Sequence, residues 1–251
     1  MESETAVSEA SRLVESAQRV GITLRMMGAC AFRIHCPNSR KLYDNLSRPI
    51  TDIDFVSYSK YNSKMKPFFD SQNYGSDARI IALFGRERHQ YVHPEGTVKV
   101  DVFFDRLAMN HIVDFKGRLE LDSLTITLVD LLLEKLQIVQ LTEKDIKDTI
   151  VLLREHPVGT TENETVNAAY LAKILAEDWG FWYTATTNLQ KVQEYVNGSN
   201  LLAEDDKAIV SRRSNELKAA IEAQPKSTKW KMRSRIGPKK KWYNEVETVV
   251  R

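Results

Sequence analysis

The stretch Ile-Thr-Asp-Ile-Asp-Phe-Val-Ser, at residues 50–57, decides the fold prediction because it has the two-residue period of a β-strand. Its apolar positions Ile53 and Phe55 alternate with Asp52 and Asp54, so the two carboxylates project from the same face of the strand. Two neighbouring carboxylates repel each other and resist burial. A divalent cation removes that repulsion, since Mg²⁺ binds carboxylate oxygens while it keeps several waters.

A second acidic strand is predicted at residues 97–105, Thr-Val-Lys-Val-Asp-Val-Phe-Phe-Asp, where Asp101 stands between two valines. Three carboxylates on neighbouring strands, Asp52, Asp54 and Asp101, would hold one or two Mg²⁺ or Mn²⁺ ions. Such ions orient a triphosphate and stabilise the attacking and leaving oxygens of an in-line displacement. The alternative interpretation of each aspartate is a solvated strand end or turn.

Gly28 and Ala29 directly follow a predicted strand at residues 22–27 and open a predicted helix. A glycine at this place lets the backbone approach a ligand, and the free N–H groups of a helix N-terminus favour phosphate. The alternative is a tight strand-to-helix turn with no ligand.

These segments, in this order, resemble the nucleotidyltransferase superfamily. The resemblance is carried by Met-Gly-Ala-Cys-Ala (27–31), Arg-Pro-Ile-Thr-Asp-Ile-Asp-Phe-Val (48–56) and Val-Lys-Val-Asp-Val-Phe (98–103). Leu-Leu-Leu-Glu-Lys-Leu (131–136) and Glu-Lys-Asp-Ile-Lys-Asp-Thr-Ile (143–150) are similar to the helical motif of its AbiEii-type, toxin-like branch. Two features depart from the pattern: Ala29 replaces a Gly or Ser, and Asp52 follows Gly28 at a spacing of 24 positions, which is longer than usual.

The resemblance implies an α+β fold, in which a mixed β-sheet, polymerase-β-like domain with flanking helices precedes a helical C-terminal domain. It implies NTP as the donor substrate and Mg²⁺ (or Mn²⁺) as the cofactor. Asp52, Asp54 and Asp101 would be the catalytic residues and metal ligands, with Asp101 as the third ligand or as the general base.

The resemblance also implies a set of nucleotide-binding residues. Gly28 and Ala29 would line the triphosphate, and Lys135 would reach a phosphate. Asp145 and Asp148 match carboxylates that lie near the nucleotide in the family. A helix N-terminus also attracts aspartate through its dipole, so a structural role for this pair stays open.

Apolar spacing predicts the organisation of the whole chain. Residues 1–120 are predicted to form the mixed α/β catalytic domain, residues 121–224 a helical domain and residues 225–251 a basic tail. Further strands are predicted at residues 79–84 and 89–93, and residues 37–49 are predicted to be a loop. Helices are predicted at residues 7–20, 65–71, 123–140, 144–154, 166–177, 181–197 and 205–223.

The basic tail carries a charge of +8 between Glu222 and Glu245, which leaves −6 for the rest of a chain whose net charge is +2. Aromatic residues are interleaved with these cations. Cations neutralise phosphates and aromatic rings stack on bases, so the tail is a candidate nucleic-acid-binding segment, and a solvated tail is the equal alternative. The candidate contact residues are Lys229, Trp230, Lys231, Arg233, Arg235, Lys239, Lys240 and Lys241.

Composition sets the remaining limits. A chain of 251 residues with 42% hydrophobic and 28% charged residues is typical of a globular protein, and no apolar run is long enough to cross a membrane. Cys30 and Cys36 form no disulfide framework and read as small buried residues. The acidic start has no apolar segment of a secretory signal, so we expect a cytoplasmic protein without a membrane partner.

The sequence therefore predicts a metal-dependent nucleotidyltransferase that moves NMP from NTP to a hydroxyl acceptor, with an RNA or tRNA 3′ end as the candidate acceptor. Membership of the AbiEii-type branch would add a cognate antitoxin protein as a partner. Two alternatives remain open: a non-catalytic nucleotide- or RNA-binding protein on the same fold, and a small-molecule (antibiotic) nucleotidyltransferase.

Overall fold

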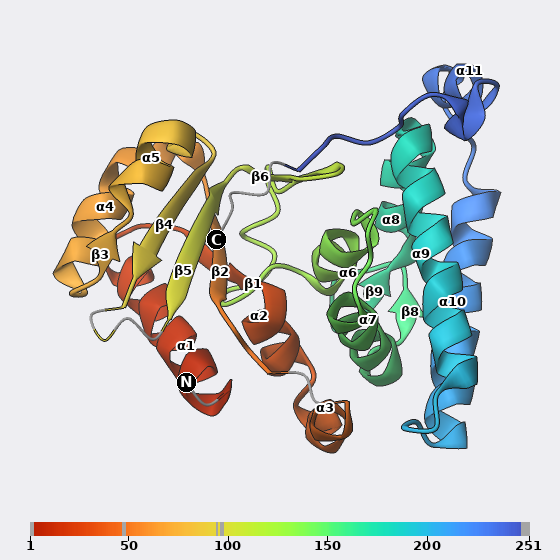
Figure 1. Ribbon diagram of the computed structural model, residues 1–251, viewed down its shortest axis with the longest axis horizontal. Coiled ribbons are helices and arrows are strands. Elements are labelled where there is room, and N and C mark those ends of the chain that lie inside the picture. The colour runs from red at the N-terminus through yellow and green to blue at the C-terminus, as the bar shows by residue number, and fades with distance from the viewer. Residues whose placement is uncertain (1–2, 47–48, 94, 96–97, 247–251) are drawn as a thin grey trace. The chain divides into compact units, whose positions relative to one another are not determined.

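The computed structural model describes residues 3–46, 49–93, 95 and 98–246 (Figure 1). Arg48 and Thr97 of the predicted motif strands, and residues 247–251 of the predicted tail, lie outside these ranges. The chain divides into two compact units. Unit 1 comprises Met1–Pro37, Pro49–Leu107 and Asp114–Thr127, and unit 2 comprises Asn38–Arg48, Ala108–Val113 and Leu128–Arg251.

Both units are built from several stretches of chain, whereas the predicted domains are continuous. Residues 121–127 lie in unit 1, and the tail lies in unit 2. Residues 37–49, predicted as a loop, contain the 3₁₀ turn η1 (Pro37–Ser39) and helix α3 (Arg40–Asn45). Asn38–Arg48 of this segment belong to unit 2, where the Glu155 carboxylate accepts hydrogen bonds from the Asn38 backbone N–H at 3.0 Å and from Ser39 Oγ at 2.6 Å.

A five-stranded mixed sheet forms the centre of unit 1 (Figure 1). Its strand order is β1 (Leu24–Met27), β2 (Ile53–Ser57), β5 (Lys99–Phe104), β4 (Arg88–Val92) and β3 (Gly75–Ser76). Strands β2 and β5 pair in parallel, and the other neighbours pair antiparallel. The mixed sheet that the sequence predicted is therefore confirmed, with the two acidic strands as direct neighbours.

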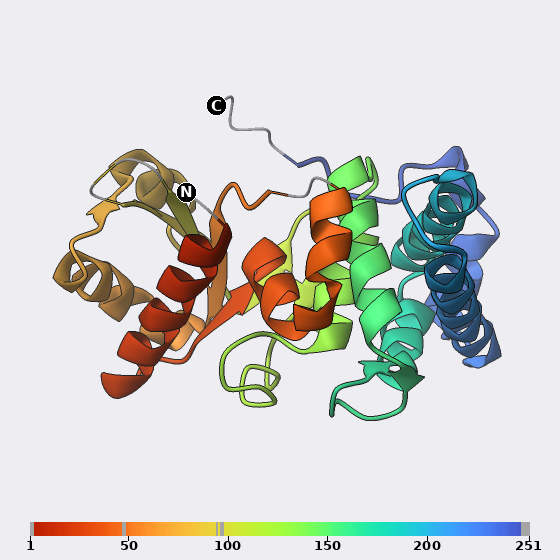
Figure 2. The same ribbon diagram turned by 90° about the horizontal axis from the view of Figure 1, so that it is seen from below.

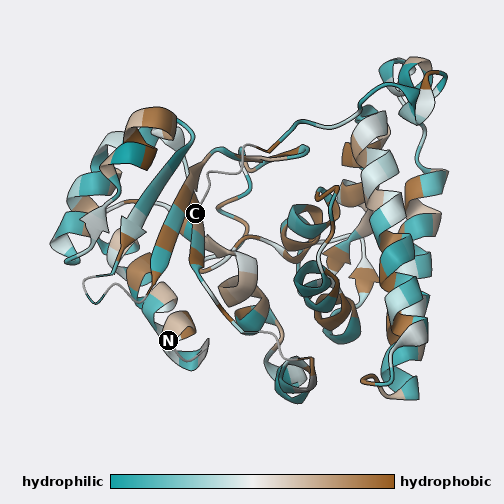
Figure 3. Ribbon diagram, viewed as in Figure 1, coloured by the Kyte–Doolittle hydropathy of each residue, from teal (hydrophilic) through white to brown (hydrophobic). Residues whose placement is uncertain are grey.

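The alternation of residues along the strands gives the sheet two different faces (Figure 3). On one face the rows Ile53–Val100–Tyr91 and Phe55–Val102–His89 are buried. The opposite face carries the row Asp54–Asp101–Gln90. Burial of the first face supplies the hydrophobic stabilisation of the sheet, which leaves the second face available for polar side chains.

The helices of unit 1 are α1 (Ser3–Arg19), α2 (Gly28–His35), α4 (Asn62–Ser71) and α5 (Ala78–Phe84), with a 3₁₀ turn η2 (Ser59–Tyr61). The predicted strand at residues 79–84 is wrong, because this segment is helix α5. Asp77 explains the difference: its Oδ1 accepts hydrogen bonds from the backbone N–H groups of Arg79 and Ile80, both at 3.0 Å. This N-cap starts a helix in a sequence whose apolar run is typical of a strand.

Unit 2 is mainly helical (Figure 2). Helices α9 (Trp179–Gly198) and α10 (Glu204–Ala223) lie side by side, and α8 (Ala168–Glu177) packs against both. Helices α6 (Leu128–Leu136) and α7 (Glu143–Glu155) complete the core, and α11 (Thr228–Ser234) with the 3₁₀ turn η3 (Gly237–Lys239) forms the tail. Leu131, Leu152, Leu189 and Leu217 are fully buried and show that these helices share one apolar core.

Short strands interrupt the helical pattern after residue 120. Strands β8 (Val158–Gly159) and β9 (Val166–Asn167) pair in parallel, so the prediction that this part is entirely helical is wrong in detail. Strands β6 (Arg106–Ala108) and β7 (Ile112–Asp114) form a two-stranded sheet, and along the sequence each contains residues assigned to both units. Among the residues that the structure describes, no helix is long and apolar enough to cross a membrane.

Candidate active site

Two of the predicted carboxylates lie side by side in the sheet of unit 1. Asp54 on β2 and Asp101 on β5 are direct Cα partners in the parallel register, and Gln90 on β4 is the partner of Asp101 on its other side. Paired residues of neighbouring strands project from the same face of a sheet. The three side chains therefore form one polar row, which we call the Asp54–Gln90 row.

Asp101 is held by an arginine fork that the sequence analysis did not identify. Arg88 donates from Nε to Oδ1 at 3.0 Å and from Nη2 to Oδ2 at 2.8 Å. Gln90 Nε2 donates to Oδ1 at 2.9 Å. The side chain of Asp101 is only 7% exposed, whereas that of Arg88 is 28% exposed. A bidentate, charge-assisted pair of this kind orders and neutralises the carboxylate.

The alternation of β4 contains a signal for this contact. In the sequence Arg-His-Gln-Tyr-Val at residues 88–92, Arg88 and Gln90 share one face, and His89 and Tyr91 share the buried face. A cation placed two residues from a polar partner on the strand next to an acidic strand indicates a pair across the sheet. The identity of the neighbouring strand was the missing information, because sequence alone does not give the strand order.

Gly28 begins α2 directly after β1, as predicted, and touches Asp54. A Cβ atom at position 28 would lie 2.5 Å from Asp54 Oδ2, and the φ of Gly28 is +62°. Both the close contact and the left-handed backbone require glycine. The Asp54 carboxylate thus lies at the start of α2, the place where the sequence analysis put a triphosphate beside Gly28 and Ala29.

Asp52 precedes β2, and its Oδ1 accepts a hydrogen bond from Thr51 Oγ1 at 3.0 Å. Within the described ranges of the chain, no group of three or more His, Cys, Asp or Glu side chains could hold a metal ion. The arrangement does not fit the three-carboxylate metal site implied by the resemblance, because both oxygens of Asp101 already accept hydrogen bonds from Arg88 and Gln90.

Lys135 and Asp148, also predicted as nucleotide-binding residues, meet inside unit 2. Lys135 Nζ lies 3.0 Å from Glu134, 3.4 Å from Asp148 and 3.6 Å from Asp145. Burial is the largest influence on the pKa of Lys135 and lowers it. The three carboxylates together outweigh burial, so the pKa lies above its ordinary value and the ammonium stays charged. We call these four residues the Lys135 cluster.

Asp145 has a clear structural role in this cluster. Its Oδ2 accepts hydrogen bonds from the backbone N–H of Thr142 at 3.1 Å and from Thr142 Oγ1 at 2.6 Å. A carboxylate three residues into a helix that reaches back to the N-cap stabilises the helix start. Asp145 therefore has the role at a helix N-terminus that the sequence analysis gave as the alternative to nucleotide binding.

The aromatic residues of the tail pack within unit 2. The ring of Trp230 meets Trp182 edge-on at 5.1 Å, and Trp242 meets Tyr183 edge-on at 5.0 Å. Arg233 lies 4.6 Å from the centre of the Trp179 ring and donates to the carbonyls of Gly237 and Lys240, both at 2.7 Å.

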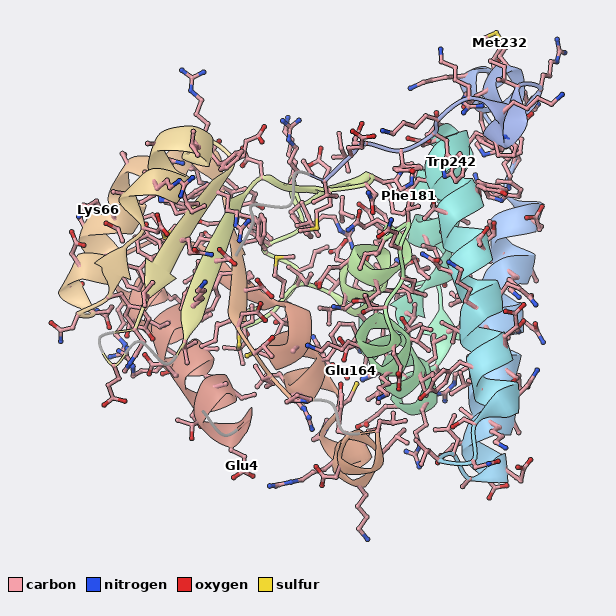
Figure 4. All side chains as sticks on the ribbon, in the orientation of Figure 1. Glu4, Lys66, Glu164, Phe181, Met232 and Trp242 are labelled. Atoms are coloured by element: carbon pink, nitrogen blue, oxygen red, sulfur yellow. The ribbon has the colours of Figure 1, made fainter. Side chains whose placement is uncertain are left out.

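These contacts divide the eight candidate nucleic-acid-binding residues of the tail into two groups. Trp230 and Arg233 serve the packing of unit 2. Met232 of the same segment is also exposed, and Figure 4 shows it pointing outward. The other six candidates are exposed: Lys229, Lys231, Arg235, Lys239, Lys240 and Lys241.

A buried histidine in unit 2 also escaped the sequence analysis. The ring of His111 stacks on Phe181 at 4.9 Å and 3°, and Nε2 lies 2.8 Å from Thr184 Oγ1. Both rings line a cavity of about 320 Å³ together with Trp242, which is labelled beside Phe181 in Figure 4. Burial lowers the pKa of His111 to about 4, so the ring is neutral at pH 7. Cys30 and Cys36 are buried and not disulfide-bonded, as expected.

Comparisons with known proteins do not identify the function of this site. No protein-family model matches the chain, and no curated protein matches it. Among solved structures, the chain is similar to an antigenic nucleotidyltransferase-like protein from Paracoccidioides brasiliensis, with 17% identity over 91% of this chain and 97% of that chain and a TM-score of 0.43. An identity and a TM-score of this size establish no shared activity.

Proposed function

We propose that the chain is a nucleotidyltransferase that moves NMP from NTP to a hydroxyl acceptor on the polar face of the unit 1 sheet. One observation carries this proposal. Asp54 and Asp101 are neighbours in register on parallel strands, and Asp54 touches the glycine that opens α2. This places two carboxylates beside a helix N-terminus, which combines groups that can accept a proton with a site that favours phosphate.

The reaction balances as a single displacement. The acceptor hydroxyl oxygen forms a bond to the α-phosphorus of NTP, and the bond from that phosphorus to the bridging oxygen breaks. Pyrophosphate leaves with the electron pair, and the hydroxyl proton passes to a carboxylate of the Asp54–Gln90 row. Mg²⁺ or Mn²⁺ is the cofactor that we expect for this reaction, although Arg88 and Gln90 already hold both oxygens of Asp101.

An RNA 3′ end is the acceptor that the tail favours. Six exposed Lys and Arg side chains between Lys229 and Lys241 provide a surface for phosphates. Because Trp230 and Trp242 pack against α9, this surface would bind the backbone of RNA without stacking on its bases. A cognate antitoxin protein is a further partner that we propose.

A second function is favoured by the Arg88 fork. Arg88 and Gln90 donate three hydrogen bonds to Asp101, which leaves few lone pairs of this carboxylate for a metal or a substrate. The same face could then bind nucleotide without transferring it. Nucleotide binding with no transfer to any acceptor would favour this second function.

Label transfer tests the enzyme proposal. Purified protein is incubated with each α-³²P-labelled NTP, Mg²⁺ or Mn²⁺, and total RNA or total protein. We expect transfer by the wild type and a loss of about 100-fold or more in Asp54→Asn. Asp70→Asn is the matched control, since Asp70 is an exposed aspartate of unit 1 that pairs with Lys66. Equal transfer by wild type and Asp54→Asn would reject the proposal.

The RNA acceptor has its own test in a tail variant. Lys229, Lys239 and Lys240 are exposed, so replacing all three by Gln leaves the packed aromatic residues in place. We expect weaker RNA binding and a salt dependence that is shallower by about 0.7 per lost phosphate contact. Nucleotide binding should stay unchanged. An unaltered salt dependence would show that RNA does not bind this surface.

A further inference from the structure

The cavity of about 320 Å³ beside His111 is formed by residues that all belong to unit 2. Aromatic rings make up much of its wall: His111 stacks on Phe181, and Trp242, labelled beside Phe181 in Figure 4, lines the cavity together with Tyr243. Small-molecule sites typically measure about 300–1,000 Å³, so this cavity has room for a single flat ring system. The reaction proposed for unit 1 does not use it.

The tail closes this cavity through several close contacts. The backbone N–H of Asn244 donates to the Asn110 carbonyl, and Asn110 Nδ2 donates to the Asn244 carbonyl, both at 2.9 Å. A Cβ atom at position 180 would lie 2.4 Å from the Trp242 carbonyl oxygen, so Gly180 allows the tail to lie directly on the start of α9. The cavity is therefore built by packed parts of the chain.

His111 places a hydrogen-bond donor in this cavity. Trp242 Nε1 donates to Thr184 Oγ1 at 3.0 Å, and His111 Nε2 lies 2.8 Å from the same oxygen. Among the described residues, His111 Nε2 is the only acceptor for the Thr184 hydroxyl proton. The hydrogen of the neutral His111 ring is therefore on Nδ1, because the bond made by one ring nitrogen fixes the state of the other.

The Nδ1–H group of His111 is available to a ligand. The side chain is buried, with 4% of the residue exposed, and Nδ1 has no hydrogen-bond partner among the described residues. Because Nε2 is bonded to Thr184, Nδ1 is the nitrogen left for an occupant of the cavity that His111 lines. A buried donor without an acceptor is unfavourable, so an acceptor atom of a ligand would stabilise this site.

Two carboxylates line the same cavity and supply acceptors. Glu177 has no partner among the described residues. Asp178 uses Oδ1 to accept from the Phe181 backbone N–H at 3.1 Å, which leaves Oδ2 for a ligand. Carboxylates accept hydrogen bonds and do not donate them. The cavity thus combines aromatic walls with one fixed donor and carboxylate acceptors, and it fits a flat ring that has a carbonyl and N–H donors.

We propose that this cavity binds a guanine base of single-stranded RNA, whose O6 accepts from His111 Nδ1 while N1–H and the N2 amino group donate to Glu177 and Asp178. Guanine is the RNA base that has a carbonyl beside two donors on one edge. Adenine and cytosine have only an amino group as donor, and uracil has only one N–H. The inference deepens the proposed function, since it rests on RNA as the acceptor.

The basic tail leads directly to this cavity. Lys239 and Lys240 are exposed, and Lys240 precedes Trp242 by two residues, which is about 7 Å of extended chain at most. Phosphate contacts position a nucleic acid, and contacts to base edges read its sequence. The exposed lysines would hold the RNA backbone, and the cavity would take one base out of the strand, as single-stranded RNA allows.

The experiment measures binding and needs no turnover. The full chain is titrated in a calorimeter with guanosine, adenosine, cytidine, uridine and inosine. We expect guanosine to bind about tenfold or more tighter than the other four, including inosine, which lacks the N2 amino group. An oligoadenylate that ends in one 3′ guanosine should likewise bind about tenfold tighter than the oligoadenylate without it.

Variants place the bound base in the cavity. His111→Phe keeps an aromatic ring against Phe181 and removes the donor, and Glu177→Gln replaces an exposed carboxylate. Each should weaken guanosine binding by about tenfold. Glu194→Gln is the matched control, since Glu194 is exposed on α9 and does not line the cavity. If His111→Phe loses the wild-type circular dichroism spectrum, Glu177→Gln decides.

Three results would overturn the inference: equal affinities for all five nucleosides, guanosine binding that is unchanged in the folded cavity variants, or a guanosine preference that is absent from the oligonucleotides. The last result would assign the cavity to a free nucleoside. Asp54→Asn should bind guanosine as the wild type does, because Asp54 lies in unit 1. Loss of guanosine binding in Asp54→Asn, with retention in the cavity variants, would also reject the cavity.

Failure of the proposed function is distinguishable from failure of this inference. Guanosine-specific binding that depends on His111 or Glu177, in a protein without label transfer, would reject the enzyme and retain the base site. Label transfer to RNA without any preference for guanosine would retain the enzyme and reject the base site.

Discussion

The Arg88–Asp101 pair of unit 1 and the Lys135 cluster of unit 2 place a cation against carboxylates in opposite ways. Arg88 faces one carboxylate, and its side chain is 28% exposed. Lys135 faces three carboxylates, and its side chain is 8% exposed. Arg88 is partly exposed and pairs with a single buried carboxylate, whereas Lys135 is itself buried among several anions and cannot leave without stranding all of them. The comparison indicates that the Arg88–Asp101 pair belongs to the candidate active site, whereas the Lys135 cluster stabilises unit 2.

Replacing Lys135 is the strongest way to break this comparison. Lys135→Met keeps the volume but leaves Glu134, Asp145 and Asp148 without their shared cation. We expect the free energy of unfolding to fall by about 3–5 kcal/mol. Urea unfolding followed by tryptophan fluorescence measures this loss in unit 2, since all four tryptophans lie between residues 179 and 242.

Lys144→Met is the control for that measurement, because Lys144 is exposed in the first turn of the same helix α7. It should change the free energy of unfolding by less than about 0.5 kcal/mol. A Lys135→Met variant as stable as this control would mean that the buried cluster does not stabilise unit 2, and the contrast with the Arg88–Asp101 pair would disappear.

The pH dependence of unit 2 sharpens the comparison through His111. Its pKa of about 4 in the folded state lies below the value of about 6.5 in the unfolded chain, so the unfolded state binds the proton first. The stability contributed by neutral His111 is complete above about pH 6.5 and is lost as the pH falls towards about 4. We expect a total loss of about 3 kcal/mol.

The contribution of His111 is isolated by comparing variants. The free energy of unfolding of unit 2, measured by tryptophan fluorescence, should fall between pH 7 and pH 4.5 in the wild type. In His111→Gln most of this fall should be absent. His93→Gln, a substitution in unit 1, should show the same fall in the free energy of unfolding as the wild type. If His111→Gln shows the same slope as the wild type, other groups in unit 2 cause the pH dependence.

Gly28→Ala tests the polar face of unit 1 and has the smallest expected effect. The substitution combines a left-handed backbone with a contact of 2.5 Å to Asp54 Oδ2. We expect a loss of about 2 kcal/mol in calorimetric unfolding. Gly21 also has a positive φ, but no atom lies within 4 Å of a Cβ added there. The free energy of unfolding should therefore fall by only about 1 kcal/mol in Gly21→Ala.

The difference between the two glycine variants reports the contact with Asp54. Adding Asp54→Ala to Gly28→Ala should remove this difference, because the carboxylate oxygen is then absent. Equal losses in Gly28→Ala and Gly21→Ala would show that the Asp54 carboxylate moves away freely.

Local patterns predicted much of the fold. The two acidic strands and the long helices α9 and α10 lie within a few residues of their predicted places, because each has a strong apolar period. The turn at Gly28 lies where the glycine indicated it. Helix α5 was missed because its short apolar run has no clear period, and the Asp77 cap decided its conformation. Residues 37–49, which contain α3, were predicted to be a loop because this helix is only six residues long.

The candidate site was predicted only in part. Asp54 and Asp101 were expected to be neighbours, and they are. Their partners were not expected, since Arg88 and Gln90 lie on a strand whose place in the sheet depends on long-range pairing. The tail aromatic residues have the composition of a stacking surface, but Trp230 and Trp242 pack against α9.

The sequence by itself determined which faces of the strands carry charge and where the helices run, because both follow from the periods of side chains along a single segment. The tertiary structure alone decided the partner of each charge. Strand order brought Arg88 to Asp101, and helix packing enclosed Lys135 among three carboxylates. Charge interactions depend on distance and burial, and neither quantity is local in the sequence.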